Sequence, residues 1–169
     1  MNYVKAGIFF FICWLFQTTL MWRIWPFGAA PSLLFCAVIC FAWLYRSNYF
    51  LVYAVCFGLL LDLQSSQIFG VQALALVLCS VPALLLRLYF HPERTLAAML
   101  AALIGTPVYL FTVWGAHRLF GTAIDISLVI PDLPQLGISQ TLICLILHIS
   151  FVRTIIKDKK DRRYVGGVM

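Results

Sequence analysis

The sequence predicts an all-α integral membrane protein, built as a bundle of six transmembrane helices. Of its 169 residues, 63% are hydrophobic and only 11% are charged, and the mean hydropathy is +0.98. This composition excludes a soluble domain, in which about a quarter of the residues are charged. The apolar residues form continuous runs, whereas an outer-membrane barrel needs alternation. Six spans of about 20 residues use about 120 residues, so we expect residues 1–169 to form a single membrane domain.

The first three expected spans precede a short polar connection. We interpret the apolar run after Lys5 as an uncleaved span, because Pro31 makes a poor cleavage context after the small residues. The second run has only about 14 residues, so we expect it to recruit flanking residues or to tilt in a thin region. Polar residues 46–48 close it. The three spans are Ala6–Trp22, Ser32–Tyr45 and Tyr49–Leu63.

The last three spans follow the uncharged connection 64–67, which is too short for anything but a tight helical hairpin. Pro92 ends the fourth run, because proline stops a helix. The segment Arg118–Gln135 contains two prolines and two aspartates, so we expect a short interfacial helix or a strap there. The three spans are Ile68–Phe90, Thr95–His117 and Leu136–Ile156, and a basic tail (157–169) follows them.

The basic residues predict the orientation of the bundle. With both termini in the cytoplasm, ten of the twelve Lys and Arg residues lie inside and two lie outside, a strong positive-inside bias that requires an even number of spans. The tail is interpreted as a juxtamembrane segment near anionic headgroups, with no nucleic acid as partner. The inner residues are Lys5, Arg46, Arg87, Arg94, Arg153, Lys157, Lys159, Lys160, Arg162 and Arg163, and the outer ones are Arg23 and Arg118.

Asp62 is an acidic residue inside an apolar run. A carboxylate in a membrane helix is costly and is therefore a functional candidate by default. Asp62 also lies near the outer end of the third span, where it or the serines just after it are placed to cap the N-terminus of the fourth helix. The sequence leaves open both the cap and a contact with a partner or ligand.

Small residues recur at four-residue spacing in the fifth span, at Ala97, Ala101 and Gly105. Such spacing permits close helix approach, either within the bundle or against another protein's helix. Arg87, near the end of the fourth span, is interpreted as snorkelling to headgroups. The six cysteines lie in apolar runs and are interpreted as small buried hydrophobes. Catalytic and metal-binding motifs are absent from the sequence, so we expect no enzyme, no cofactor and no metal site.

One stretch resembles a known family. Pro31 opens the second span, Gly58-Leu59-Leu60-Leu61-Asp62 ends the third, and Phe69-Gly70-Val71-Gln72-Ala73-Leu74 begins the fourth. These elements resemble the MreD family, the small rod-shape-determining membrane proteins of bacteria. In that family a proline opens the second span, and a G-x-x-x-D hairpin runs into a glycine-containing helix start.

The resemblance implies a six-helix bundle similar to the substrate-binding subunits of energy-coupling-factor transporters. It also implies a non-enzymatic scaffold in the bacterial inner membrane, whose partners are the membrane helix of MreC, the MreB filament and the peptidoglycan synthases of the elongation machinery. The alternative is a substrate-binding subunit of an energy-coupling-factor-type vitamin transporter. Membrane lipid is a further partner, and a homo-oligomer is left open. The candidate structural or partner-contact residues are Pro31, Gly58, Asp62, Gly70, Ala97, Ala101 and Gly105.

Overall fold

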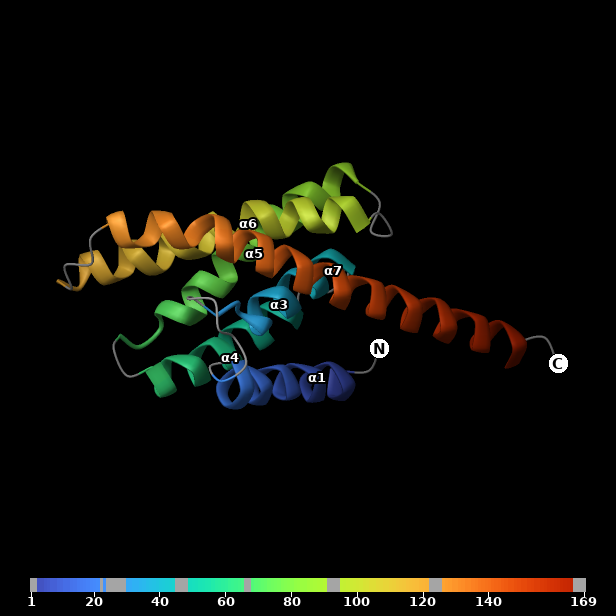
Figure 1. Ribbon diagram of the computed structural model, residues 1–169. Coiled ribbons are helices and arrows are strands. Elements are labelled where there is room, and N and C mark those ends of the chain that lie inside the picture. Colours follow the sequence, from blue (N-terminus) through green and yellow to red (C-terminus); the bar gives the residue numbers. More distant parts are fainter. Residues whose placement is uncertain are drawn as a thin grey trace.

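The computed structural model (Figure 1) describes residues 3–21, 23, 30–44, 49–65, 68–90, 95–121 and 126–165. Within these ranges the chain forms helices and no strand. The residues expected to close the second run (46–48) and to end the fourth (Pro92) lie outside the described residues. The helices are α1 (Tyr3–Phe16), the π-helical η1 (Gln17–Met21), α3 (Leu33–Leu44), α4 (Tyr49–Ser65), α5 (Val71–Tyr89), α6 (Thr95–Leu119) and α7 (Ile126–Val165).

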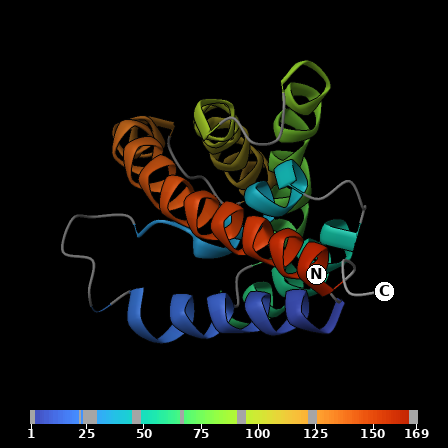
Figure 2. The same ribbon diagram turned by 90° about the vertical axis from the view of Figure 1, so that its right-hand side faces the viewer.

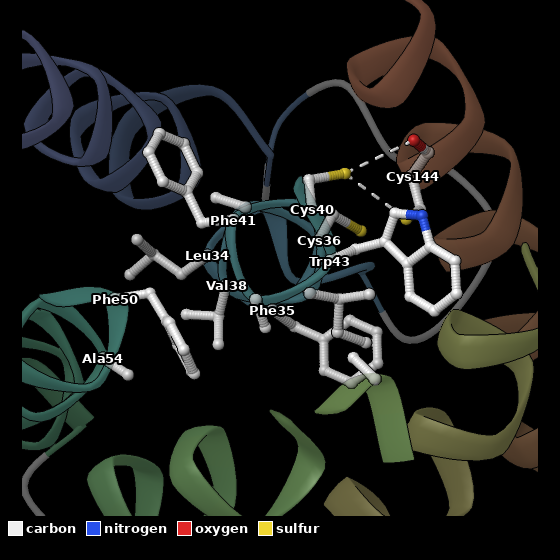
Figure 3. Close-up of a cluster of buried hydrophobic side chains, with 14 of the residues drawn as sticks. Leu34, Phe35, Cys36, Val38, Cys40, Phe41, Trp43, Phe50, Ala54 and Cys144 are labelled. Carbon is white, nitrogen blue, oxygen red and sulfur yellow. Dashed lines mark hydrogen bonds between the residues drawn. The ribbon is translucent and has the colours of Figure 1, made fainter. Parts of the chain in front are cut away.

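Helix α3 forms the centre of the molecule. All of its residues from Leu34 to Trp43 are buried, and it contacts α1, α4, α5, α6 and α7. A helix that is apolar all round can be covered by protein or by lipid, and in this structure other helices cover α3. Figure 3 shows its side chains pointing in several directions, with Phe50 of α4 and Cys144 of α7 among their neighbours.

The length of α3 explains the short second run. Twelve residues at a rise of about 1.5 Å per residue give a helix of about 18 Å, whereas the hydrocarbon core is about 30 Å thick. The expectation that this run recruits flanking residues or tilts in a thin region stays a prediction. Other helices surround α3, and the backbone groups at its two ends need hydrogen-bond partners.

In the part of the chain that the structure describes, three helices are long and apolar enough to cross a membrane, and three further apolar helices are shorter. The arrangement therefore fits a membrane protein, while six full-length spans are not confirmed. The long ones are Val71–Tyr89, Thr95–Leu119 and Ile130–Val152, and the short ones are Ala6–Thr19, Leu33–Leu44 and Tyr49–Gln64.

The expectation that Arg118–Gln135 forms a separate short helix or a strap is wrong, because most of this segment belongs to the long helices α6 and α7. Helix α6 ends at Leu119, and Gly121, with a φ of 86°, follows in the left-handed conformation that commonly ends helices. Helix α7 then begins at Ile126 and continues through Pro131 and Pro134. Each proline removes one backbone hydrogen bond, but packing of α7 along α6 keeps the helix continuous. The same helix carries the first part of the expected tail as far as Val165.

The beginning of α1 and the end of α7 lie at the same end of the molecule (Figures 1 and 2). The charge distribution predicts this relation between the two ends.

Candidate functional site: a helical hairpin capped by Asp62

The α4–α5 hairpin is organised around the carboxylate of Asp62, which is only 3% exposed. Its Oδ2 accepts hydrogen bonds from the backbone N–H groups of Gly70 at 3.0 Å and Ala73 at 3.3 Å, and its Oδ1 accepts one from Gln72 at 2.9 Å. The first N–H groups of a helix have no intrahelical partner, and the N-terminus carries partial positive charge. Asp62 therefore caps α5 from the neighbouring helix.

Gly58 makes this cap possible. A Cβ atom at Gly58 would lie 2.4 Å from the Cα atom of Ala73 and 2.8 Å from its backbone nitrogen. The missing side chain thus lets the backbones of α4 and α5 touch. Asp62 lies four residues later on the same helix face, and that one turn carries its carboxylate to the start of α5. The spacing in G-x-x-x-D thereby has a direct geometric cause.

Gly70 is the N-cap residue of α5 and has a φ of 96°. This left-handed conformation is costly for residues that carry a Cβ atom. No atom lies within 4 Å of the Cβ position at Gly70, so the demand for glycine comes from the backbone rather than from space. Gly70 has no side-chain oxygen with which to cap the helix, which leaves that role to Asp62.

The N-terminus of α3 has a similar cap, formed by Ser32 and Gln17. The Ser32 Oγ accepts a hydrogen bond from the Phe35 N–H at 3.2 Å, while Gln17 Oε1 accepts one from the Leu34 N–H at 3.0 Å. The Gln17 amide also donates to Ser32 Oγ at 3.3 Å. Pro31 is buried just before this cap. Sequence reasoning missed Gln17, although it begins a short polar stretch, with Thr18 and Thr19, inside the first apolar run.

Arg87 supports the opposite end of α3. Its Nη1 donates to the carbonyl oxygen of Ala42 at 3.1 Å, near the C-terminus of the helix, where a cation is favourable. The side chain is half-buried. Its position is thus set at least partly by α3, which the snorkelling interpretation did not foresee.

The small residues of α6 are buried within the chain. Ala97 and Ala101 are at most slightly exposed, and a Cβ at Gly105 would lie 2.9 Å from Ile39 Cδ1 and 3.3 Å from the carbonyl oxygen of Cys79. They therefore let α6 approach α3 and α5. Of the two alternatives left open by the sequence, packing within the bundle is the one observed.

Tyr109 continues this line of residues and connects the two capped helix starts. Its hydroxyl donates to Gln72 Oε1 in the first turn of α5. Its ring meets that of Phe35, near the start of α3, edge-to-face with centroids 5.6 Å apart. The sequence analysis did not single out Tyr109. Its position four residues after Gly105 in the stripe of small residues is the signal that was available.

Further buried polar contacts join α3, α6 and α7. Thr106 Oγ1 donates to Gln140 Oε1 at 2.8 Å, and the Cys36 thiol donates to the Gln140 carbonyl at 3.3 Å. The thiols of Cys40 and Cys144 face each other with sulfurs 3.5 Å apart (Figure 3). Five of the six free cysteines are buried as expected, and Cys56 is exposed. Within the described residues, no group of three or more His, Cys, Asp or Glu side chains is arranged to hold a metal ion.

The comparisons with known proteins agree with the resemblance seen in the hairpin. The family described as rod shape-determining protein MreD matches residues 2–155. The searches of curated proteins and of solved structures returned no match. The expected likeness to transporter subunits is thus not confirmed, and the vitamin-transporter alternative gains no support. Because the family match covers nearly the whole chain, this protein belongs to the MreD family of rod shape-determining proteins.

Proposed function

We propose that this protein is a non-enzymatic scaffold of the bacterial rod-shape and cell-wall elongation complex. It lies in the inner membrane with both termini in the cytoplasm, binds the membrane helix of MreC and helps to position peptidoglycan synthesis near the MreB filament. Membership of the MreD family supports a role in rod shape.

The observation that carries the proposal is the construction of the hairpin. Asp62 accepts three backbone hydrogen bonds at the start of α5, so its carboxylate serves to hold the two helices together. A hairpin fixed in this way presents a shape that a partner helix can recognise with little loss of conformational entropy.

The exterior of the hairpin offers the apolar surface for such a contact. Leu63 is 67% exposed and Phe69 is 65% exposed, and Leu74 lies nearby on the exposed side of α5. The stripe of small residues on α6 is already used inside the bundle. We therefore place the MreC contact on the outer surface of the α4–α5 hairpin instead of on that stripe.

Co-purification with MreC tests this placement. The double variant Leu63→Ala and Phe69→Ala should lower the recovery of MreC about tenfold, since loss of about 1.4 kcal/mol in binding corresponds to a tenfold change. The matched control is Leu88→Ala and Tyr89→Ala, which trims two side chains at the other end of α5 that are 79% and 83% exposed. Equal recovery of MreC with both double variants would contradict the placement.

A second pair of variants tests whether the hairpin matters for the complex at all. Asp62→Leu removes the cap, and Gly70→Leu puts a branched side chain at a φ of 96°. Both should weaken the MreC complex and cause loss of rod shape in cells. If both leave the complex and the rod shape unchanged, the hairpin has no such role.

A further inference from the structure

The thiols of Cys40 and Cys144 form a contact between two helices that are far apart in the sequence. Their sulfur atoms are 3.5 Å apart, and Cys40 Sγ lies 3.6 Å from the carbonyl oxygen of Cys144 (Figure 3). Both side chains are fully buried, Cys40 on the central helix α3 and Cys144 on α7. We propose that this pair is a redox-sensitive site, at which a lipid-soluble quinone oxidises the two thiols to a disulfide that joins α3 to α7.

The register of α3 against α7 holds the two sulfur atoms next to each other. The Cys36 thiol, one turn before Cys40, donates to the carbonyl oxygen of Gln140 at 3.3 Å, and Gln140 lies one turn before Cys144. The two helices therefore meet at two successive turns in the same register. A disulfide bond is about 2.0 Å long, so the sulfur atoms need to approach by only about 1.5 Å. Small rotations of the two side chains and a small shift of α7 supply that approach.

Two neighbouring buried cysteines have hydrogen-bond partners on the backbone instead. Cys36 donates to the Gln140 carbonyl, and Cys79 donates to the carbonyl oxygen of Leu76 at 3.1 Å. A disulfide needs a second thiol within reach, and the contact between Cys40 and Cys144 supplies it. The pair is therefore chemically different from these buried cysteines.

The apolar surroundings of the pair select the class of oxidant. An ion left in such surroundings is costly, so an oxidant that takes up the hydrogens together with the electrons is favoured. Two S–H bonds break, one S–S bond forms, and both hydrogens with their electrons reduce the quinone to the hydroquinone. No ion is left in the core after this step.

Helix α7 also sets the route of the oxidant. Cys144 points inward, whereas Leu142 and Ile146 on the same helix are 52% and 64% exposed, so α7 forms the outer wall next to the pair. A quinone dissolved in the bilayer reaches the thiols when α7 separates locally from α3. The resulting cross-link joins residues 104 positions apart and constrains the unfolded chain. This inference goes beyond the proposed function, because it requires neither MreC nor any other partner protein.

Counting free thiols in the full chain tests the proposal. The reduced chain is reconstituted into lipid vesicles and treated with decylubiquinone, whose fully substituted ring accepts electrons but does not add to thiols. After denaturation, N-ethylmaleimide should label all six cysteines of the untreated chain and four of the treated monomer, and mass spectrometry should find the peptide that joins Cys40 to Cys144. The oxidised chain should unfold at a temperature higher by roughly 4–16 °C, and dithiothreitol should reverse that shift.

Three alanine variants locate the site. Cys40→Ala and Cys144→Ala should each keep all of their remaining cysteines labelled after treatment, because each has lost one member of the pair. Cys36→Ala, one turn earlier on α3, is the matched control and should lose two labelled cysteines as the wild type does. Equal loss of labelling in Cys36→Ala and Cys40→Ala would overturn the pair as the site.

A second oxidant separates the pair from the quinone. Diamide, a membrane-permeant azo compound, also takes two hydrogens from two thiols and is applied to the same vesicles. A joined peptide with diamide alone would overturn the quinone as the oxidant. A treated wild type that keeps six labelled cysteines with both oxidants would overturn the redox-sensitive site itself.

Discussion

Replacing Asp62 with alanine removes the cap of α5 and leaves three backbone N–H groups, those of Gly70, Gln72 and Ala73, without their acceptor. A buried donor that loses its partner costs about 1–3 kcal/mol, so three of them set an upper limit of about 9 kcal/mol. Measured losses of single N-caps are about 0.5–2 kcal/mol. Water that reaches the end of the hairpin replaces part of the lost bonding, and we therefore expect a loss of about 2–5 kcal/mol.

Thermal unfolding of the purified chain in detergent, followed by tryptophan fluorescence, measures this loss. For a chain of this size about 1 kcal/mol corresponds to roughly 2–4 °C in Tm, so Asp62→Ala should lower the Tm by roughly 4–20 °C. Asp62→Asn keeps one acceptor oxygen and loses the charge that favours the helix N-terminus, and it should lower the Tm by less than half as much.

Gln64→Ala is the matched control, because Gln64 is an exposed polar residue two positions later in α4. Its Tm should stay within about 2 °C of the wild-type value, as for surface substitutions in general. The reasoning is refuted if Asp62→Ala and Asp62→Asn both unfold at the wild-type temperature. It is also refuted if Gln64→Ala loses as much stability as Asp62→Ala.

Two further substitutions probe close approach and the support of α3. Gly58→Ala should destabilise the chain by about 1–3 kcal/mol through overpacking against Ala73. The control Gly137→Ala, with no neighbouring atom within 4 Å of its Cβ position, should be neutral or stabilising by up to about 1 kcal/mol. The unfolding temperatures of both variants test this difference, and an equal shift would contradict the role of Gly58. Arg87→Met keeps the apolar stem but loses the hydrogen bond to the Ala42 carbonyl, and it should cost about 1–3 kcal/mol. Unfolding in denaturant measures that cost. If Arg87→Met unfolds at the same denaturant midpoint as the wild type, α3 does not need this contact.

The elements with a local signal were predictable from the sequence. Gly58 and Asp62 lie one helical turn apart before a connection too short to allow anything but a hairpin, so their meeting with the start of α5 follows from spacing alone. The membrane character follows from the composition. The family resemblance drawn from Pro31, Gly58, Asp62 and Gly70 is confirmed by the match over residues 2–155.

The features that the sequence could not give depend on distant partners. Gln17 and Arg87 form hydrogen bonds with the two ends of α3, which lies between them in the chain. The residues next to Gln17 and Arg87 in the sequence do not indicate these partners. Hydropathy identified α3 as an apolar run but could not distinguish a helix facing lipid from one surrounded by protein. The sequence predicted a separate short helix or a strap at Arg118–Gln135, because local propensity does not include the packing of α7 on α6.

The two ends of α3 set an order for its assembly in the membrane. Its N-terminus depends on Gln17, which is synthesised before α3, and its C-terminal carbonyl at Ala42 depends on Arg87, which is synthesised after it. In lipid, each backbone group without a partner costs several kcal/mol. A nascent chain in which α3 has been inserted before α5 is therefore an intermediate whose Ala42 carbonyl still lacks its hydrogen bond from Arg87. The central helix reaches its final position only when a later helix enters the bilayer, so insertion of this bundle is cooperative across helices.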